Sequence, residues 1–299
     1  RPQDRGFQHT LTHGGGGVGQ VPDYFGNDYF DDTYYENGVP KKFEGYCTDI
    51  WFSEAIKWIE ENKDQPFFAY ISTNAPHSPF IVEDRYRDLY PETFNAINVP
   101  SEFYGMITNI DENFALLEAK LEALNLRQNT ILIFTTDNGS SAGIQIHNAG
   151  MQGGKNSDFD GGHRVPFFIR WPDGNIGGNK DVEALTAHVD ILPTLLAMTN
   201  TPNPKNQELD GVDLTPLLKT GEWGIKNRVI VTDTQRVYTP QKWKGTAVMS
   251  EHWRLLKNGT KLFNIKSDPA QTNDVSAEHP EIVERLNQSY SNWWNETSP

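Results

Sequence analysis

An apolar run near the middle of the chain limits its fold more than any other feature. Residues 131–134 read Ile-Leu-Ile-Phe, and the run ends on Asp137, Asn138 and Gly139. Such a continuous β-branched and aromatic stretch fits a strand covered on both faces, as in a parallel sheet, better than an alternating surface strand. Ligands of parallel sheets bind at the carboxyl ends of the strands. The sequence therefore predicts a binding site at Asp137 and Asn138.

The residues at this strand end have the chemistry of a metal and anion site. Asp137 offers a carboxylate and Asn138 an amide carbonyl, which are oxygen ligands of the kind a hard divalent cation takes. Lys155 and Arg164 follow in a glycine-rich stretch and return positive charge to the same region. An ordinary Asn-Gly turn is the alternative, because Asp-Asn-Gly is common loop sequence.

Two helices are expected before this strand, with a second buried strand between them. Apolar residues recur at intervals of three and four over residues 47–62 and 107–124, the pattern of helices that face a core. Residues 66–73 form another apolar run and are predicted to be a strand. Helix and strand then alternate, as they do in βαβ units. Cys47 lies on an apolar stripe of the first helix, so we interpret it as a packed residue.

His77 follows the strand predicted at 66–73, within Asn-Ala-Pro-His-Ser-Pro-Phe at residues 74–80. The prolines on either side restrict the backbone and hold the imidazole in place. A single histidine is usually a surface or packed residue. Its position after a strand end is what favours a functional role.

The first 45 residues are rich in Gly, Asp, Asn and Tyr and show neither helical nor strand periodicity. The run of glycines at 14–17 lacks the Lys-Ser/Thr and the spacing of a phosphate-binding loop, so we expect an irregular loop. Asp31 and Asp32 form a paired carboxylate. They lie among tyrosines rather than after a buried strand, and a solvated or capping role is expected.

The last part of the chain has a different texture. Residues 189–196 predict a helix, and His188 and Asp190 are expected to cap or pack it. Short strand-like pieces then follow in order at 228–232, 246–249, 253–256 and 261–264, which suggests an antiparallel meander. A closing helix begins near Pro280, since proline suits a first helical turn. We expect a large domain over 1–221 and a small α+β subdomain over 222–299.

Charge and composition exclude several classes of partner. The 299 residues carry 26 basic and 40 acidic side chains, a net charge of −14. This charge argues against nucleic acid or an anionic membrane as the main partner. No apolar run approaches the roughly 18 residues that a membrane span needs. Cys47 is the single cysteine, which excludes an internal disulfide and fits either a reducing cytosol or a disulfide-free periplasmic protein.

Six motifs together resemble a known family. They occur in order along most of the chain: Asn-Ala-Pro-His-Ser-Pro-Phe (74–80), Ile-Phe-Thr-Thr-Asp-Asn-Gly (133–139), Gly-Gly-Lys (153–155), Asp-Gly-Gly-His-Arg-Val-Pro (160–166), His-Val-Asp-Ile-Leu-Pro-Thr-Leu-Leu (188–196) and Leu-Phe-Asn-Ile-Lys-Ser-Asp-Pro (262–269). This set resembles the formylglycine-dependent type I sulfatases of the alkaline-phosphatase-like superfamily. The resemblance implies an α/β fold with a mixed sheet flanked by helices, and a C-terminal antiparallel sheet plus helix.

The resemblance also implies roles for particular residues. Asp137 and Asn138 look like two ligands of the calcium ion that holds the sulfate oxygens and the nucleophile in this family. His77 resembles the histidine near the leaving-group oxygen, able to act as a general acid. Lys155 resembles the lysine that contacts the sulfate and its bridging oxygen, and Arg164 is a further candidate for substrate binding. Salt screens charge over roughly 10 Å, so these local cations can outweigh distant carboxylates.

Other parts of the family pattern are missing from this sequence. Family members carry two further metal-binding aspartates, a Cys/Ser-x-Pro-x-Arg motif whose first residue becomes the formylglycine nucleophile, and a Lys-Trp-His segment. Cys47 cannot substitute, because Thr48-Asp49-Ile50-Trp51 follow it. The sequence begins at Arg1 with no start methionine, and we expect it to be the C-terminal portion of a sulfatase, with an incomplete calcium site and no turnover alone.

Two alternatives remain at the level of sequence. One is a phosphodiesterase or phosphonate hydrolase of the same superfamily, although Asn138 beside Asp137 favours a sulfatase. The other is a non-catalytic protein that binds a sulfated glycan without cutting it. The expected substrate is a sulfated small molecule or polysaccharide, and residues 24–35 and 145–151 could line subsites or be packed loops. Secretion or a periplasmic location is expected from the resemblance alone.

Overall fold

The computed structural model describes residues 1–91, 99–203 and 207–298. The chain divides into two compact units, Arg1–Arg127 and Gln128–Pro299. The boundary predicted at 221/222 is a different division and remains a prediction. Each unit is described by itself below.

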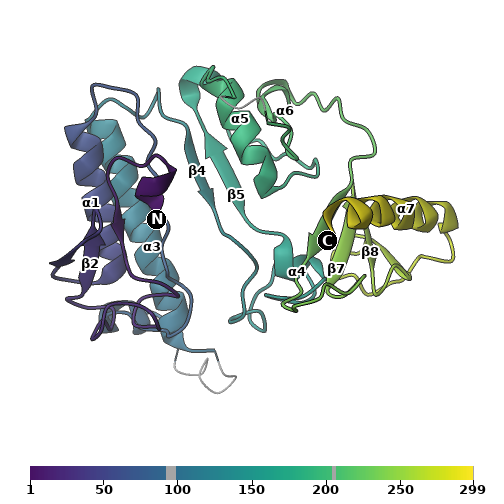
Figure 1. The fold of residues 1–299 in the computed structure, drawn as a ribbon, viewed down its shortest axis with the longest axis horizontal. Coiled ribbons are helices and arrows are strands. Elements are labelled where there is room, and N and C mark those ends of the chain that lie inside the picture. The colour runs from purple at the N-terminus through teal and green to yellow at the C-terminus, as the bar shows by residue number, and fades with distance from the viewer. Residues whose placement is uncertain (92–98, 204–206, 299) are drawn as a thin grey trace. The chain divides into compact units, whose positions relative to one another are not determined.

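Two long helices form the frame of the first unit (Figure 1). Helix α1 spans Cys47–Glu61 and helix α3 spans Ser101–Ala123, as the apolar spacing predicted, with the short α2 at Asp84–Arg87 between them. Asp49 joins the long helices, since Asn109 and Asn113 both donate amide hydrogen bonds of 2.7 Å to its carboxylate. Both asparagines are buried, so these bonds satisfy polar groups that would otherwise lack partners.

The N-terminal stretch is more ordered than its composition suggested. After a 3-10 turn at Pro2–Arg5, an antiparallel sheet pairs β1 (Leu11–Thr12) with β2 (Thr33–Glu36), and β2 with β3 (Val39–Lys42). These strands were not predicted. The irregular loop expected for the glycine run at 14–17 is confirmed, since no helix or strand is assigned to those residues. Periodicity failed as a signal because the strands are too short to repeat an alternating pattern.

Asp31 and Asp32 have capping roles, as expected. The carboxylate of Asp32 is buried, and it accepts hydrogen bonds from the amides of Asp28 and Tyr29 and from the Tyr34 hydroxyl. Asp31 accepts a hydrogen bond from the Gly45 amide at 2.7 Å. The pair therefore fixes a turn. The solvated alternative does not hold for Asp32.

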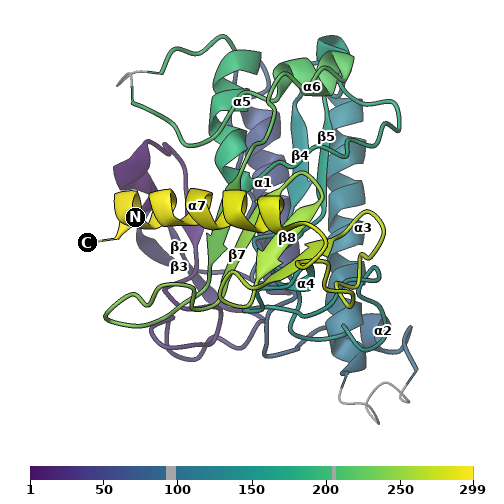
Figure 2. The same ribbon diagram turned by 90° about the vertical axis from the view of Figure 1, so that its right-hand side faces the viewer.

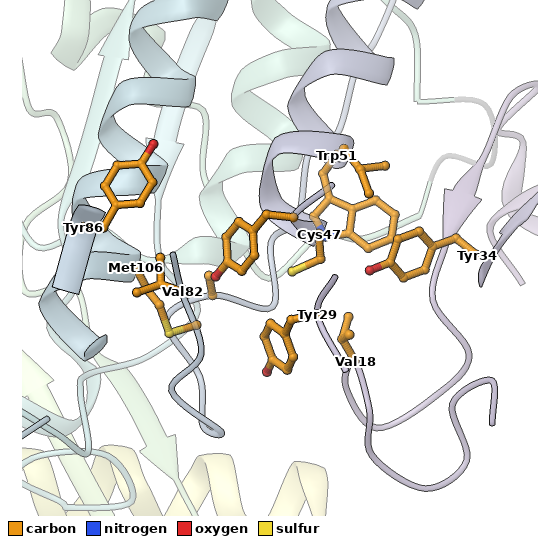
Figure 3. Close-up of a cluster of buried hydrophobic side chains, with 11 residues drawn as sticks. Val18, Tyr29, Tyr34, Cys47, Trp51, Val82, Tyr86 and Met106 are labelled. Atoms are coloured by element: carbon orange, nitrogen blue, oxygen red, sulfur yellow. The ribbon is translucent and has the colours of Figure 1, made fainter. Parts of the chain in front are cut away.

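Cys47 lies in the core of the first unit, as predicted. Figure 3 shows it among Tyr29, Tyr34 and Trp51, and its side chain is fully buried. Burial raises the pKa of the Cys47 thiol to about 12. A thiol in this state is a poor nucleophile, because the thiolate is the reactive form.

Residues 66–73 do not form the predicted strand. No strand is assigned there in the described structure, and Phe68 and Tyr70 are 63% and 72% exposed. Phe67 packs edge-on against Trp58 of α1, with ring centroids 6.0 Å apart. The composition suits a strand, but among the described residues no neighbouring strand supplies the hydrogen-bonded ladder that a strand needs.

The apolar run of the second unit forms strand β4, Leu132–Thr135. It pairs with β5, Phe167–Arg170, in antiparallel register with Leu132 opposite Arg170. All four β4 residues are half-buried. The expectation of a parallel strand covered on both faces is therefore not met among the described residues. The chain leaves β4, passes through the loop over residues 136–166 and reverses its direction, so that β5 pairs with β4 antiparallel.

Short helical segments follow β5 in the chain. Their bounds are His188–Asp190 (η4), Ile191–Met198 (α5) and Thr215–Thr220 (α6), after a 3-10 turn at Pro172–Gly174. Asp190 caps as expected, since it accepts the Ala187 amide at 2.8 Å and pairs with Arg228. Two residues of the predicted apolar face, Val189 and Leu192, are about half exposed.

The C-terminal meander and helix are confirmed. Strands β6 (Ile230–Asp233), β7 (Thr246–Ser250), β8 (Trp253–Leu256) and β9 (Lys261–Asn264) pair in sequence order, all antiparallel. Helix α7, Pro280–Thr297, lies across this sheet (Figure 2). Their shared core consists of Val248, Leu255, Leu262, Leu286 and Tyr290. In the described part of the chain, no helix combines the length and apolarity needed to cross a membrane.

Candidate functional site

The loop after β4 carries Asp137 and Asn138, and its backbone is held from two sides. His188 Nε2 lies 2.8 Å from the carbonyl oxygen of Thr136, and the Gly139 amide donates to the Gly162 carbonyl at 3.0 Å. Among the described residues, no side chain forms a hydrogen bond with the Asp137 carboxylate or the Asn138 amide. Both side chains therefore keep their oxygens available for a ligand.

Close backbone packing distinguishes this loop from an ordinary Asn-Gly turn. A Cβ atom at Gly139 would collide with the carbonyl oxygen of Gly161, and one at Gly162 would collide with that of Ser157. Only glycine permits such approaches of one main chain to another. The three loop segments around 139, 153 and 161 therefore form one tightly packed assembly.

Lys155 belongs to this assembly. Its amide donates to the Ser140 carbonyl at 2.9 Å, which places its backbone beside the Asp137 loop. The side chain is half-buried and forms no ion pair with the described residues. Its ammonium group thus has no structural partner there and is available for an anion.

Arg164 and Asp160 lie on either end of the short helix α4, Asp160–His163. Arg164 is exposed and its Nη1 lies 3.8 Å from Asp160 Oδ2, so one face of its guanidinium group remains open. Asp160 is fully buried and accepts a 2.8 Å charged hydrogen bond from Arg254 Nε of β8. The structure therefore gathers Asp137, Asn138, Lys155 and Arg164 on connected loops of the second unit.

His77 belongs to the first unit and is exposed. Its Nδ1 lies 2.7 Å from the Ser78 carbonyl oxygen, which also accepts a 2.9 Å hydrogen bond from Gln20 Nε2. A carbonyl can only accept, so Nδ1 carries a proton and Nε2 is directed to other partners. The imidazole and Gln20 of the Gly-rich N-terminal loop therefore share one carbonyl acceptor.

The residues present fit part of a calcium site. Calcium takes six to eight oxygen ligands, and Asp137 and Asn138 supply two. Within the ranges that the structure describes, no three His, Cys, Asp or Glu side chains are grouped so that they could hold a metal. The donor chemistry agrees with calcium, and the donor number is incomplete.

Arg254 and Gln271 were missed by sequence reasoning. Both are buried and both contact Asp160, over 94 and 111 residues of separation. A weak signal was present, since Arg254 interrupts an otherwise apolar strand between Trp253 and Leu255. His188 was interpreted only as a capping or packing residue, and the structure adds its contact with Thr136.

Comparison with known proteins identifies the family. The sequence model of the Sulfatase family matches residues 3–201, two thirds of the chain. The chain belongs to the sulfatase family. The predicted resemblance to type I sulfatases is thereby confirmed at the level of the family.

Two relatives of this sulfatase chain are named for the carbohydrate on which they act. An N-acetylgalactosamine-6-O-sulfatase of Bacteroides thetaiotaomicron is 26% identical over 262 residues, covering 80% of this chain and 49% of that protein. An ulvan-active sulfatase of Formosa agariphila is 32% identical over 211 residues, covering 64% of this chain and 40% of that protein. The chain thus spans about half the length of the curated relatives it matches.

A solved structure has the same fold as the sulfatase chain. The crystal structure of Ps i-CgsB in complex with k-i-k-neocarrahexaose superposes with a TM-score of 0.84 at 26% identity. The match covers 98% of this chain and 67% of that one. The predicted alkaline-phosphatase-like fold, with its C-terminal antiparallel sheet and helix, is confirmed.

Proposed function

We propose that the intact protein, meaning the product of its complete gene, hydrolyses sulfate esters of a sulfated carbohydrate. The observation that carries the proposal is the packed loop assembly, in which Gly139 and Ser140 bond to the backbones of Gly162 and Lys155. It brings onto adjoining loops two candidate oxygen ligands and an ammonium group that has no ion-pair partner in the part of the chain that the structure describes. The membership of the chain in the sulfatase family supports the same reaction.

Asp137 and Asn138 would hold a calcium ion at the end of β4. A bound calcium ion would supply positive charge to the sulfate oxygens as negative charge develops on them. The two side chains contribute a charged and a neutral oxygen, and hydrogen bonds to Thr136 and Gly139 hold the backbone on either side of them. This arrangement costs little reorganisation when the ligand enters.

Lys155 would bind the sulfate group. Its half-buried ammonium has no ion-pair partner among the described residues, so it loses no internal interaction when an anion arrives. Arg164 would add a second cation, because Asp160 restrains its guanidinium group at 3.8 Å while leaving it exposed. Both would contribute to binding and to charge stabilisation as the S–O bond breaks.

His77 would protonate the departing alcohol oxygen. Because Nδ1 is engaged by the Ser78 carbonyl, the proton that can be transferred is the one on Nε2 of the imidazolium form. Exposure of the ring suits contact with a leaving group that is itself large and solvated.

We further propose that a formylglycine outside residues 1–299 supplies the nucleophile. Cys47 does not meet the requirement, since it is fully buried and its pKa is raised to about 12. We also propose that the protein is exported from the cytoplasm, because polymeric sulfated carbohydrates occur outside the cell.

The carbohydrate class rests on the relatives. One is named for N-acetylgalactosamine and another for ulvan, and Ps i-CgsB was solved in complex with k-i-k-neocarrahexaose. The net charge of −14 does not oppose a sulfated substrate, because a Debye length of about 10 Å screens distant carboxylates.

The test is a sulfate-release assay on the intact protein with a panel of sulfated mono- and oligosaccharides and an aryl sulfate. Phosphate diesters and phosphonate esters are assayed in parallel, since their preferred turnover would favour the related hydrolases. Lys155→Ala should lower kcat/KM by about a hundredfold. The exposed Lys180→Ala is the matched control and should leave the rate unchanged. Tight binding of the sulfated sugars without sulfate release would establish the non-catalytic alternative.

A further inference from the structure

We propose that Arg254 and Gln271 of the C-terminal sheet region position the Lys155 loop, so that this region is a working part of the sulfate-binding site. The inference rests on the proposed function of Lys155 and Arg164. It concerns two residues that lie outside every motif of the family pattern.

The Arg254–Asp160 ion pair is the centre of the contact. Arg254 Nε lies 2.8 Å from Asp160 Oδ1, and both side chains are at least 95% buried. Arg254 Nη1 also donates to the carbonyl oxygens of Glu251 and Trp253, each at 3.0 Å. The guanidinium group is therefore fixed to the β7–β8 turn, and through it the position of Asp160 is fixed as well.

Gln271 and Gln152 make a second connection. The side-chain oxygen of Gln271 accepts the Asp160 amide at 2.8 Å. The amide nitrogen of Gln152, in the orientation that satisfies its neighbours, donates to the carbonyls of Ala270 and Gln271 at 3.0 Å. Because Gln152 and Asp160 flank Lys155 in the sequence, both ends of the Lys155 loop are attached to the same segment.

Apolar packing reinforces the attachment. Phe159 packs against a buried cluster of Ala247, Leu256 and Phe263 on three strands of the C-terminal sheet. Lys257 adds two contacts to the same loop. Its ammonium lies 3.1 Å from Asp158 Oδ1 and over the Phe159 ring. The loop thus inserts a ring and two carboxylates into the sheet region.

Backbone hydrogen bonds connect the contacts of Asp160 and Gln152 to the candidate site. The amide of Gly161 donates to Gln152, Gly139 donates to Gly162, and Arg164 donates to Asp160. A shift of Asp160 would therefore move the Asp137 loop and the start of the Arg164 segment together. Asp160 Oδ2 has no hydrogen bond within the described residues and faces Arg164, so the same carboxylate orients the exposed cation.

Stability alone is a weak reason for such a pair. Removing two charges from water costs several kcal/mol per ion, and apolar replacements of buried pairs are often as stable. A pair that fixes the geometry of a catalytic loop has a reason to be charged, because misplacing a catalytic group by about 1 Å can cost about a hundredfold in rate. Arg254 and Gln271 are accordingly positioning residues.

The test compares Arg254→Met, Arg254→Lys and Gln271→Met in the intact protein, with Arg285→Met as the control. Arg285 contacts Ser250 on the same sheet, and among the described residues no hydrogen bond or ion pair joins it to the Lys155 loop. Rates are measured at a temperature where thermal unfolding shows every variant to be folded. Amide hydrogen exchange is followed over residues 152–164.

Arg254→Met and Gln271→Met should lower kcat/KM about tenfold or more and speed exchange in residues 152–164 about tenfold. Arg254→Lys should recover part of the rate, since it keeps a positive charge opposite the Asp160 carboxylate. Arg285→Met should change neither quantity. If Arg254→Met fails to fold, Gln271→Met, which keeps the ion pair, decides between the two outcomes.

Unchanged kcat/KM in folded variants with a lowered melting temperature would show a purely structural role and overturn the inference. Unchanged exchange in residues 152–164 would overturn it too, whatever the activity. If the wild-type intact protein releases no sulfate, the proposed function fails, while the exchange experiment still decides whether Arg254 and Gln271 hold the loop.

Discussion

His188 Nε2 lies 2.8 Å from the carbonyl oxygen of Thr136, one residue before the candidate metal ligand Asp137. Since a carbonyl only accepts, Nε2 is the donor of this hydrogen bond. His188 begins η4, so the position of the Asp137 loop depends on a helix start that lies 52 residues further along the chain.

Replacing His188 should therefore weaken calcium binding by the intact protein. His188→Ala frees the Thr136 carbonyl, and loss of such an outer partner typically costs 10- to 100-fold in metal affinity. Calorimetric titration with calcium measures the change. His252→Ala is the control, because its ring packs on Trp253 and, among the described residues, forms no hydrogen bond with the Asp137 loop. Equal affinities for wild type and His188→Ala would contradict the role assigned to this bond.

Gly139→Ala should destabilise the protein and abolish sulfate release. The added Cβ would collide with the Gly161 carbonyl oxygen, which cannot move without breaking the loop assembly. Overpacking of this kind costs about 1–3 kcal/mol of unfolding free energy. Chemical denaturation measures it, with Gly224→Ala as the control at a position with open space. Wild-type stability in Gly139→Ala would mean that the loop packs differently.

Stability should fall on the acid side because of His163. Burial lowers the pKa of His163 below its ordinary value of 6.5, although Asp160 nearby acts in the opposite direction. The unfolded chain then binds more protons than the folded one between the two pKa values. Above about pH 6.5 His163 is neutral in both states and does not change the free energy of unfolding. As the pH drops from 6.5 to the folded pKa, the free energy of unfolding decreases, and below the folded pKa the decrease is complete. His163→Gln should flatten this slope.

Thermal unfolding between pH 7.5 and pH 5 measures the effect. The comparison is between wild type and His163→Gln, with His147→Gln as a control on an exposed histidine. A slope that is identical in all three proteins would show that other groups carry the acid dependence.

The 299-residue chain alone should show no turnover of an aryl sulfate and should bind calcium weakly. Asp137 and Asn138 supply two of the six to eight oxygens that calcium takes, and Cys47 is buried. Calcium titration and sulfate release by the purified chain check both points. Catalytic turnover by this chain would require a nucleophile among its own residues and would refute the assignment.

Local patterns determined the elements whose partners are near in the sequence. Helices α1, α3 and α7 agree with their apolar spacing, because a helix satisfies its backbone hydrogen bonds internally. The β6–β9 meander was predicted for a similar reason, since each strand pairs with the next along the chain.

Strands with distant partners could not be determined in this way. Residues 66–73 have strand composition but form none, and β4 pairs antiparallel with β5 rather than in a parallel sheet. Strand pairing depends on which neighbour supplies the ladder, and composition does not specify that neighbour.

Residue type and order were enough to identify the family and to propose candidate site residues, namely His77, Asp137, Asn138, Lys155 and Arg164. Their motifs are short and continuous, so no knowledge of the folded chain was needed to find them. What holds these side chains became visible only in the folded molecule: His188 fixes Thr136, and Arg254 and Gln271 fix Asp160. Those contacts join residues 52 to 111 positions apart, and a hydrogen bond across such a separation exists only once the chain has folded.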